Sequence, residues 1–175
     1  MFFTLNPRTL ESLNPVKMAF EIERKFLVLN DSWRARASKG TFYRQGYLSL
    51  DKRRAVRVRV AGGRGFISVK SQEEGRITRR EFDYEIPLQD AEEMIEALCD
   101  HPPVDKIRYR VEEAGMTWEI DVFEGANDGL VVAEIELESE DQPIRLPDWT
   151  GAEVTHDERY LNVNLYRHPF KEWSP

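Results

Sequence analysis

The stretch EIERKFLV, residues Glu21–Val28, alternates between charged and apolar side chains along most of its length. Glu21, Glu23 and Lys25 share one phase, while the other phase is apolar except for Arg24. A repeat of two residues is the period of a β-strand, so one face of this strand is apolar and the other carries two carboxylates and an ammonium group. The fold depends on where that charged face points.

The same alternation recurs in later segments of the chain. Short turns separate most of them, which predicts antiparallel pairing and, with the first stretch, about eight strands. The segments are 42–50, 54–60, 66–71, 77–86, 105–113, 116–125 and 130–139.

Only two segments favour helices. Residues 89–100 carry an apolar stripe, and Asp90 followed by Glu93 resembles a capping box. A final helix is expected to be capped by Thr155, with Glu158 three residues further on.

Composition limits the class of protein. With 175 residues the chain fits one domain, expected at residues 18–175, with residues 1–17 as a loosely ordered extension. A net charge of −7 argues against non-specific binding to nucleic acid or to an anionic membrane. The sequence has no apolar run of the ~20 residues that span a bilayer, and its N-terminus does not resemble a secretion signal. The single cysteine, Cys99, excludes an internal disulfide, so we expect a cytoplasmic protein.

Two arrangements of the charged faces are compatible with the alternation. In the first, two sheets pack their apolar faces together and the charges meet solvent; periodicity by itself favours this arrangement. In the second, the strands close into a barrel with the charges inside. The distribution of sign favours the second, because basic residues gather on 54–60 and 105–113, whereas acidic residues gather on 116–125 and 130–139.

Clusters of like charge need compensation. Each cluster repels itself, which costs stability unless an opposite charge or a ligand neutralises it. An eight-stranded barrel is wide enough for side chains or for one small ligand. Burying about a dozen charges inside it would cost too much desolvation free energy unless bound ions or a charged ligand compensated them. A phosphate chain on the basic side and divalent cations on the acidic side would supply that balance.

The motifs also match those of a known family. Residues Glu21–Lys25 fit an ExExK signature, and the other matching motifs follow in the family's order. They are RQGYL at 44–48, VRVR at 56–59, SVKS at 68–71, TRREFDYEI at 78–86, DKIRY at 105–109, EIDVF at 119–123, AEIELES at 133–139 and EVTHDERYLN at 153–162. Over about residues 19–166 the sequence resembles the CYTH superfamily, the triphosphate tunnel metalloenzymes, and it is most similar to the short single-domain bacterial members.

The resemblance implies both a fold and an activity. The fold is mainly β (α+β): a closed eight-stranded antiparallel β-barrel with a charged interior and a few flanking helices. The activity is that of a divalent-metal-dependent triphosphatase, for which we expect inorganic tripolyphosphate as substrate. A nucleotide-acting relative (a nucleoside or thiamine triphosphatase, or an adenylate cyclase) and a non-catalytic polyphosphate or nucleotide sensor stay open as alternatives. The expected cofactor is Mg²⁺ or Mn²⁺, with two ions in the active complex, and a homodimer is left open.

The resemblance also assigns roles to residues of this sequence. The implied metal ligands are Glu21, Glu23, Glu134 and Glu136, with Asp121 as an additional ligand or a residue that orients the others. The implied phosphate-binding residues are Lys25, Arg57, Arg59, Lys70, Arg79, Lys106, Arg108 and Arg159. These assignments agree with the chemistry, because Mg²⁺ takes one or two carboxylates plus substrate phosphates and guanidinium groups grip two phosphate oxygens at once.

Among these residues, Glu21, Glu23, Lys25 and Lys106 are expected to carry the catalysis. Glu158 stands where relatives often have lysine, and two outcomes stay open: Arg159 compensates, or the affinity for substrate is weaker. For Tyr47 two roles stay open, because its hydroxyl could position substrate inside the tunnel or its ring could pack.

Overall fold

Nine strands form one antiparallel sheet in the part of the chain that this computed structural model describes, residues 22–51, 54–72 and 79–173. The strand order is β5-β4-β3-β2-β6-β7-β8-β1-β9. The strands are β1 Ile22–Val28, β2 Thr41–Ser49, β3 Ala55–Ala61, β4 Arg64–Gln72, β5 Arg79–Ile86, β6 Val104–Glu113, β7 Met116–Phe123, β8 Val131–Leu137 and β9 Thr150–Glu153. The prediction of a mainly antiparallel β fold with few helices is confirmed.

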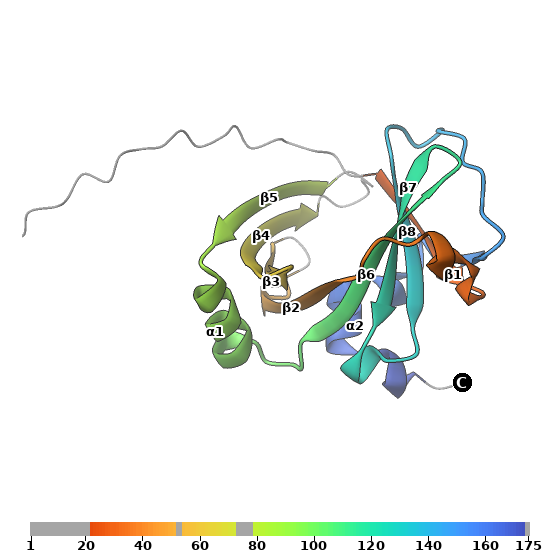
Figure 1. Ribbon diagram of the computed structural model, residues 1–175. Helices are drawn as coiled ribbons and strands as arrows, with labels where there is room; N and C mark the ends of the chain where they lie inside the picture. Colours follow the sequence, from red (N-terminus) through yellow and green to blue (C-terminus); the bar gives the residue numbers. More distant parts are fainter. Residues whose placement is uncertain (1–21, 52–53, 73–78, 174–175) are drawn as a thin grey trace, which may run out of the picture.

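The sheet is strongly curled, and Figure 1 shows the half formed by β2–β5 facing the half formed by β6, β7, β8 and β1. The curled sheet is consistent with the predicted tunnel of antiparallel strands, and it differs from a closed eight-stranded barrel in two details. First, the four-residue strand β9 pairs with β1 and adds a ninth strand. Second, β5 and β9 are the two edge strands, and no backbone hydrogen bonds among the described residues join them. The curled sheet is therefore not closed by a ladder between these edges.

Helices and short 3₁₀ turns cover the outer, convex face and one end of the sheet. They are η1 Asp31–Arg36, α1 Leu88–Leu98, η2 Gly125–Asn127, η3 Glu158–Tyr160, α2 Asn162–Arg167 and η4 Phe170–Glu172. No helix in these described ranges is long and apolar enough to cross a bilayer.

Helix α1 packs on the outside of β2, β3 and β4 (Figure 1). Its buried Ala91 and Ile95 meet Val58, which confirms the apolar stripe predicted for 89–100. The helix approaches β4 closely at Gly65, where an added Cβ would lie 2.8 Å from the Cβ of Ala91. The predicted capping box was wrong, because Pro87 occupies the N-cap position and makes no side-chain cap hydrogen bond. Proline favours the start of a helix, so α1 begins earlier than the Asp90 signal indicated.

The apolar phases of β1, β6, β7 and β8 form a second outer core. Trp33 from η1, Trp118 from β7 and Trp149 from the segment before β9 are all buried there. The ring of Trp118 lies 5.3 Å from that of Trp149, in an edge-to-face arrangement that is favourable for aromatic pairs. Because this cluster takes up the apolar phase on the convex side, the charged phase of the same strands faces the concave side.

One end of the concave face is closed by an apolar floor, a cluster that includes Tyr47, Phe123, Val132 and two residues of α2, Leu165 and Tyr166. The rings of Tyr47 and Tyr166 lie 5.2 Å apart. Of the two roles left open for Tyr47, the structure therefore supports packing.

The C-terminal helix differs from the prediction. Asp157, not Thr155, caps the short turn η3, and α2 begins only at Asn162. Thr155 instead accepts a hydrogen bond from the backbone N–H of Lys25 through Oγ1 and donates one to Glu153. Its hydroxyl is used to hold the chain after β9 against β1.

The pairing of β9 with β1 is reinforced by an ion pair that should depend on pH. The guanidinium of Arg24 donates two hydrogen bonds to the carboxylate of Glu153, the Nε–Oε1 distance being 2.8 Å, and lowers the pKa of Glu153 to about 2. A carboxylate with a lowered pKa in the folded state stabilises the protein above its unfolded-state pKa and loses that contribution as the pH falls toward about 2.

We therefore expect Glu153→Gln to lower the free energy of unfolding at pH 7 by less than about 1 kcal/mol, because the pair is partly exposed to solvent. The difference between wild type and variant should shrink as the pH falls from 5 to 3. Urea unfolding across this range measures it. A difference that stays constant with pH would show that the pair contributes no charge-dependent stability.

Candidate functional site

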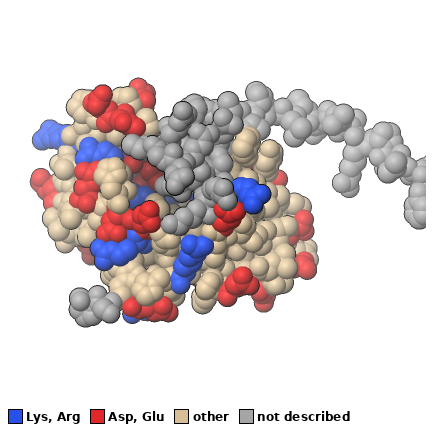
Figure 2. Space-filling model, turned by 180° about the vertical axis from the view of Figure 1, so that it is seen from behind, with Lys and Arg blue, Asp and Glu red and all other residues tan. Residues whose placement is uncertain are grey.

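The concave face of the sheet encloses a cavity of about 960 Å³ whose wall is mostly charged. Of the two arrangements compatible with the alternation, the structure therefore has the one with charges inward. The predicted site residues that line the cavity are Glu23, Lys25, Arg57, Arg59, Lys106, Arg108, Glu134 and Glu136. On the outer surface shown in Figure 2, by contrast, Lys and Arg side chains are interspersed with Asp and Glu side chains.

Strand order places the two signs in separate parts of the wall. Apart from Lys25 on β1, the described basic residues of the wall lie on β3 and β6, the two neighbours of β2, and most of its carboxylates lie on β7, β8 and β1. The cavity therefore has a basic part and an acidic part that meet between β6 and β7.

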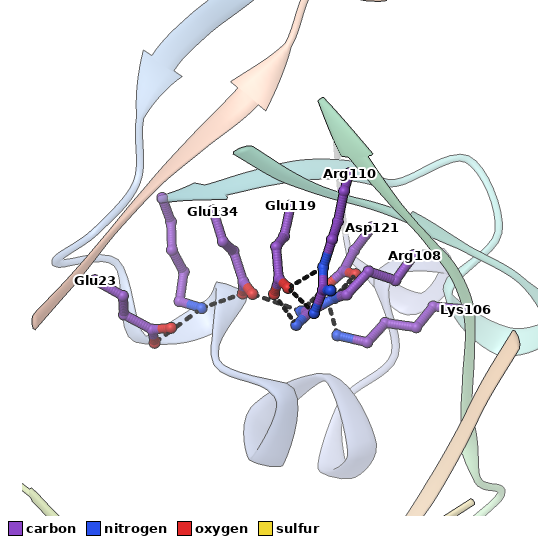
Figure 3. Close-up of polar contacts among 8 residues, drawn as sticks. Glu23, Lys106, Arg108, Arg110, Glu119, Asp121 and Glu134 are labelled. Carbon is purple, nitrogen blue, oxygen red and sulfur yellow. Dashed lines mark hydrogen bonds and ion pairs between the residues drawn. The ribbon is translucent and has the colours of Figure 1, made fainter. Parts of the chain in front are cut away.

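Arg108 on β6 joins these two parts (Figure 3). Its Nε lies 2.6 Å from Oδ1 of Asp121, and its Nη2 lies 2.6 Å from Oδ2 of the same carboxylate. Nη2 also lies 2.6 Å from Oε2 of Glu134, and Nη1 donates to Glu119. Burial by itself lowers the pKa of Arg108, but the surrounding carboxylates, led by Asp121 and Glu134, raise that pKa well above its ordinary value. Arg108 therefore stays charged in the cavity.

Lys25 on β1 lies between two carboxylates. Its Nζ donates to Glu134 and lies 3.1 Å from Oε1 of Glu23. Burial alone would lower the pKa of Lys25, but Glu134 and then Glu23 outweigh it and raise the pKa above that of an ordinary lysine. Burial by itself would raise the pKa of Glu134. The positive charges of Lys25 and Arg108 outweigh burial and hold that pKa well below its usual range.

Lys106 is the most deeply placed cation of the site. Its ammonium group is almost fully buried, donates to the fully buried carboxylate of Asp121 and lies over the ring of Phe123 in the apolar floor. Burial, followed by repulsion from Arg108, lowers the pKa of Lys106 despite the opposing effect of Asp121. The pKa values of the two buried lysines are thus shifted in opposite directions, that of Lys25 upward and that of Lys106 downward.

The two arginines of β3 are positioned by polar residues of β4 and β5. Arg57 donates through Nη2 to Oγ of Ser68 at 3.2 Å, and Arg59 lies 3.1 Å from Oδ2 of Asp83. The hydroxyl of Ser68 in turn donates to Asp83. Ser68 and Asp83 hold the basic side of the cavity, a role that the sequence pattern did not reveal because both could equally have faced solvent.

The mouth of the acidic part holds carboxylates that could bind a cation. Glu23 and Glu136 lie directly opposite each other on β1 and β8, and like charges in that position are destabilising unless a cation lies between them. The carboxylate of Glu136 makes no hydrogen bond or ion pair to the residues that the structure describes. Mg²⁺ usually takes only one or two carboxylates from a protein, so the Glu23 and Glu136 pair fits such an ion.

The other predicted metal ligands are placed differently. The oxygens of Asp121 and Glu134 are bonded to lysine and arginine side chains, so both act here as partners of cations. No group of three or more acidic, His or Cys residues within the described ranges is arranged to hold a metal. Glu21, a predicted ligand, lies outside those ranges.

Three other predicted phosphate-binding residues remain, and the structure describes the side chain of one of them, Arg159. Lys70 and Arg79 belong to β4 and β5, but their side chains lie outside what the structure describes. Arg159 lies on η3, where its exposed guanidinium pairs with Asp157 and stacks on the ring of Trp173 at 5.3 Å. It is not among the described residues that line the cavity.

Tyr43 and Gln45 on β2 are among the lining residues that the sequence analysis missed. Tyr43 lies beneath the guanidinium groups of Arg59 and Arg108, at 5.9 and 5.4 Å, and Gln45 is almost completely buried. Strand pairing could have identified them. Gln45 is paired with Arg59 and Tyr43 with Lys106, so both side chains lie on the same face of the sheet as these cations.

This geometry agrees with the comparisons to known proteins. Residues 19–167 match the model of the CYTH domain family. The chain belongs to the CYTH domain family. A CYTH relative from Acetivibrio thermocellus, named inorganic triphosphatase, is 49% identical over 157 residues, which cover 90% of this chain and 99% of the relative.

Two further similarities agree with this assignment to the CYTH family. A relative from Nitrosomonas europaea, also named inorganic triphosphatase, is 37% identical over 153 residues, covering 83% of this chain and 95% of the relative. A crystal structure of an inorganic triphosphatase has a TM-score of 0.64 at 34% identity, over 85% of this chain and 95% of that chain.

Proposed function

We propose that this protein is a divalent-metal-dependent triphosphatase that hydrolyses inorganic tripolyphosphate. The observation that carries the proposal is one cavity wall on which a basic part and an acidic part lie side by side. The names of the two curated relatives support the same substrate. A short polyanion fits the basic part, and divalent cations fit the acidic part.

Substrate binding would rest on the cations of β3 and β6. Arg57 and Arg59 approach from one side, and Lys106 and Arg108 from the other. Guanidinium forks grip two phosphate oxygens, while Lys106 acts as a point charge. Because the carboxylates of Asp83 and Asp121 already hold these side chains in place, little conformational entropy is lost when the phosphate chain binds.

Glu23 and Glu136, with Glu134 beside them, would hold the metal at the acidic part of the wall. When bound there, a divalent cation supplies Lewis-acid neutralisation of the phosphate oxygens. Glu21 and Glu23 stay predicted metal ligands, and Glu21 lies outside the residues that the structure describes.

The protein's own contribution to the reaction is mainly positioning and charge stabilisation. As the oxygen of a water molecule bonds to the phosphorus under attack and the bond from that phosphorus to the bridging oxygen breaks, negative charge increases on the leaving phosphate, and Arg57, Arg59 and Arg108 would stabilise it. Lys106, with its lowered pKa, is suited to hold or release a proton next to that charge. The apolar floor excludes water from the inner end of the cavity.

A substrate panel tests the proposal. We expect phosphate release from tripolyphosphate in the presence of Mg²⁺ or Mn²⁺, slower release from pyrophosphate, ATP and thiamine triphosphate, and none after chelation of the metal. Arg57→Ala should weaken turnover about tenfold to hundredfold, the usual range for a lost charge-assisted hydrogen bond. Arg44→Ala is the matched control, because Arg44 points away from the cavity and pairs with Asp105.

The alternatives have their own outcomes in this panel. Formation of cyclic AMP and pyrophosphate from ATP would identify a cyclase instead. Tight binding of tripolyphosphate without turnover in any divalent metal would identify a sensor. Either result would contradict the proposed hydrolysis.

A further inference from the structure

Gln45 is a neutral residue in the middle of the basic part of the cavity. Its strand, β2, lies between β3 and β6, and in the register of the sheet Gln45 is opposite Arg59 on one side and Val104 on the other. The adjacent cross-strand pairs on the same face are Tyr47 with Arg57 and Tyr43 with Lys106. A phosphate group that contacts Arg57 or Arg59 of β3 and Lys106 of β6 would therefore lie close to Gln45 and Tyr43.

The amide of Gln45 is buried but unsatisfied. Only 1% of the residue is exposed, and its Nε2 has no hydrogen-bond partner among the described residues. By contrast, Lys25, Ser68 and Lys106, three other buried polar side chains of this wall, donate to Glu134, Asp83 and Asp121 respectively. A buried donor without a partner destabilises a fold, so the presence of this amide at a buried position calls for a functional explanation.

We propose that the side-chain amide of Gln45 donates a hydrogen bond to a phosphate oxygen of the bound substrate and so positions the inner end of the phosphate chain. The amide is next to the apolar floor, since both Val104 and Tyr47 belong to that cluster. An amide donor satisfies an oxygen there without adding a further positive charge beside Arg57, Arg59 and Lys106. The inference rests on the proposed function, because it needs a polyanion in the cavity.

A positioning role and a structural role make opposite predictions for the variant Gln45→Met, which keeps the shape of the side chain and removes the amide. If the amide serves only the fold, its loss should destabilise the protein. If it serves the ligand, the protein without ligand should become more stable, because an unsatisfied buried donor has been removed, with a rise in melting temperature of about 2–4 °C.

The test measures melting temperature and tripolyphosphate binding for wild type, Gln45→Met and Gln45→Glu, by calorimetry in chelator-treated buffer. We expect Gln45→Met to weaken binding about tenfold to hundredfold while its melting temperature rises. Gln45→Glu should weaken binding further, because its carboxylate repels phosphate, and should also melt higher, because that carboxylate meets the neighbouring cations. Gln89→Met on the exposed surface of α1 is the matched control and should change neither quantity.

The outcomes separate this inference from the proposed function. Unchanged binding by Gln45→Met, or a lower melting temperature, would overturn the role of Gln45 while leaving the activity of the wild type intact. Failure of the wild type both to bind and to hydrolyse tripolyphosphate would overturn the proposed function, and the role of Gln45 with it.

Discussion

Replacement of Arg108 by alanine is expected to lower the free energy of unfolding by about 3–5 kcal/mol, the usual cost of removing one partner from a buried ionic network. Arg108 bonds to three carboxylates, and its side chain is only 15% exposed. Without it, Lys106 is the one cation left beside the fully buried Asp121 and Lys25 the one left beside Glu134, among the described residues, so the network loses a positive charge and keeps all its carboxylates. Urea unfolding at neutral pH measures the loss.

Arg110→Ala is the control for this prediction. Arg110 lies two residues along the same strand and contacts one of the same carboxylates, Glu119, at 3.1 Å, but its side chain is 64% exposed. Exposed ion pairs contribute less than about 1 kcal/mol, so this variant should be close to wild type. Equal stability of the two variants would show that water or rearranged side chains replace Arg108, and that the network is not a buried one.

The variant Glu134→Gln should move substrate binding and turnover in opposite directions. The change removes one negative charge beside Lys25 and Arg108, so tripolyphosphate should bind more tightly in the absence of metal. Turnover with Mg²⁺ should nevertheless fall by about 10²–10³, because a carboxylate that balances the cations and is predicted to hold the metal has been lost. Calorimetric binding and phosphate release measure the two effects.

A different result would assign another role to Glu134. If the carboxylate only orients Lys25 and Arg108, binding and turnover should fall together. Glu93→Gln, an exposed change on α1 that also removes one negative charge, is the matched control and should leave both unchanged.

The strands were predictable because their signal is local. The stretch Glu21–Val28 alternates with period two, and the structure makes nearly all of it a strand, β1. The short strand β9 was missed because its four residues, TGAE, carry no alternation that distinguishes a strand from a loop. It is held in place by Arg24 and by the backbone of β1, and these contacts arise only after the chain has folded.

The site was predictable in its residue types but only partly in its contacts. Lys25, Arg57 and Arg108 do line one cavity, as the family resemblance implied. Which charges meet is decided by register, and no pattern along one strand gives the position of another. Register places Glu23 opposite Glu136, and strand order places Gln45 between two basic strands.

The sequence by itself determined that this protein has two-faced strands, with one apolar face and one face on which positive and negative charges are grouped by strand. It could not determine which face is inside, because alternation is the same for a sheet that curls in either direction. The tertiary structure decided this by placing α1 and the tryptophan cluster on the convex side and closing one end of the concave side with α2. Once the apolar faces are buried outside the curl, the charged faces must converge within it. The cations grouped on β3 and β6 then repel one another, and a bound polyanion would relieve that repulsion.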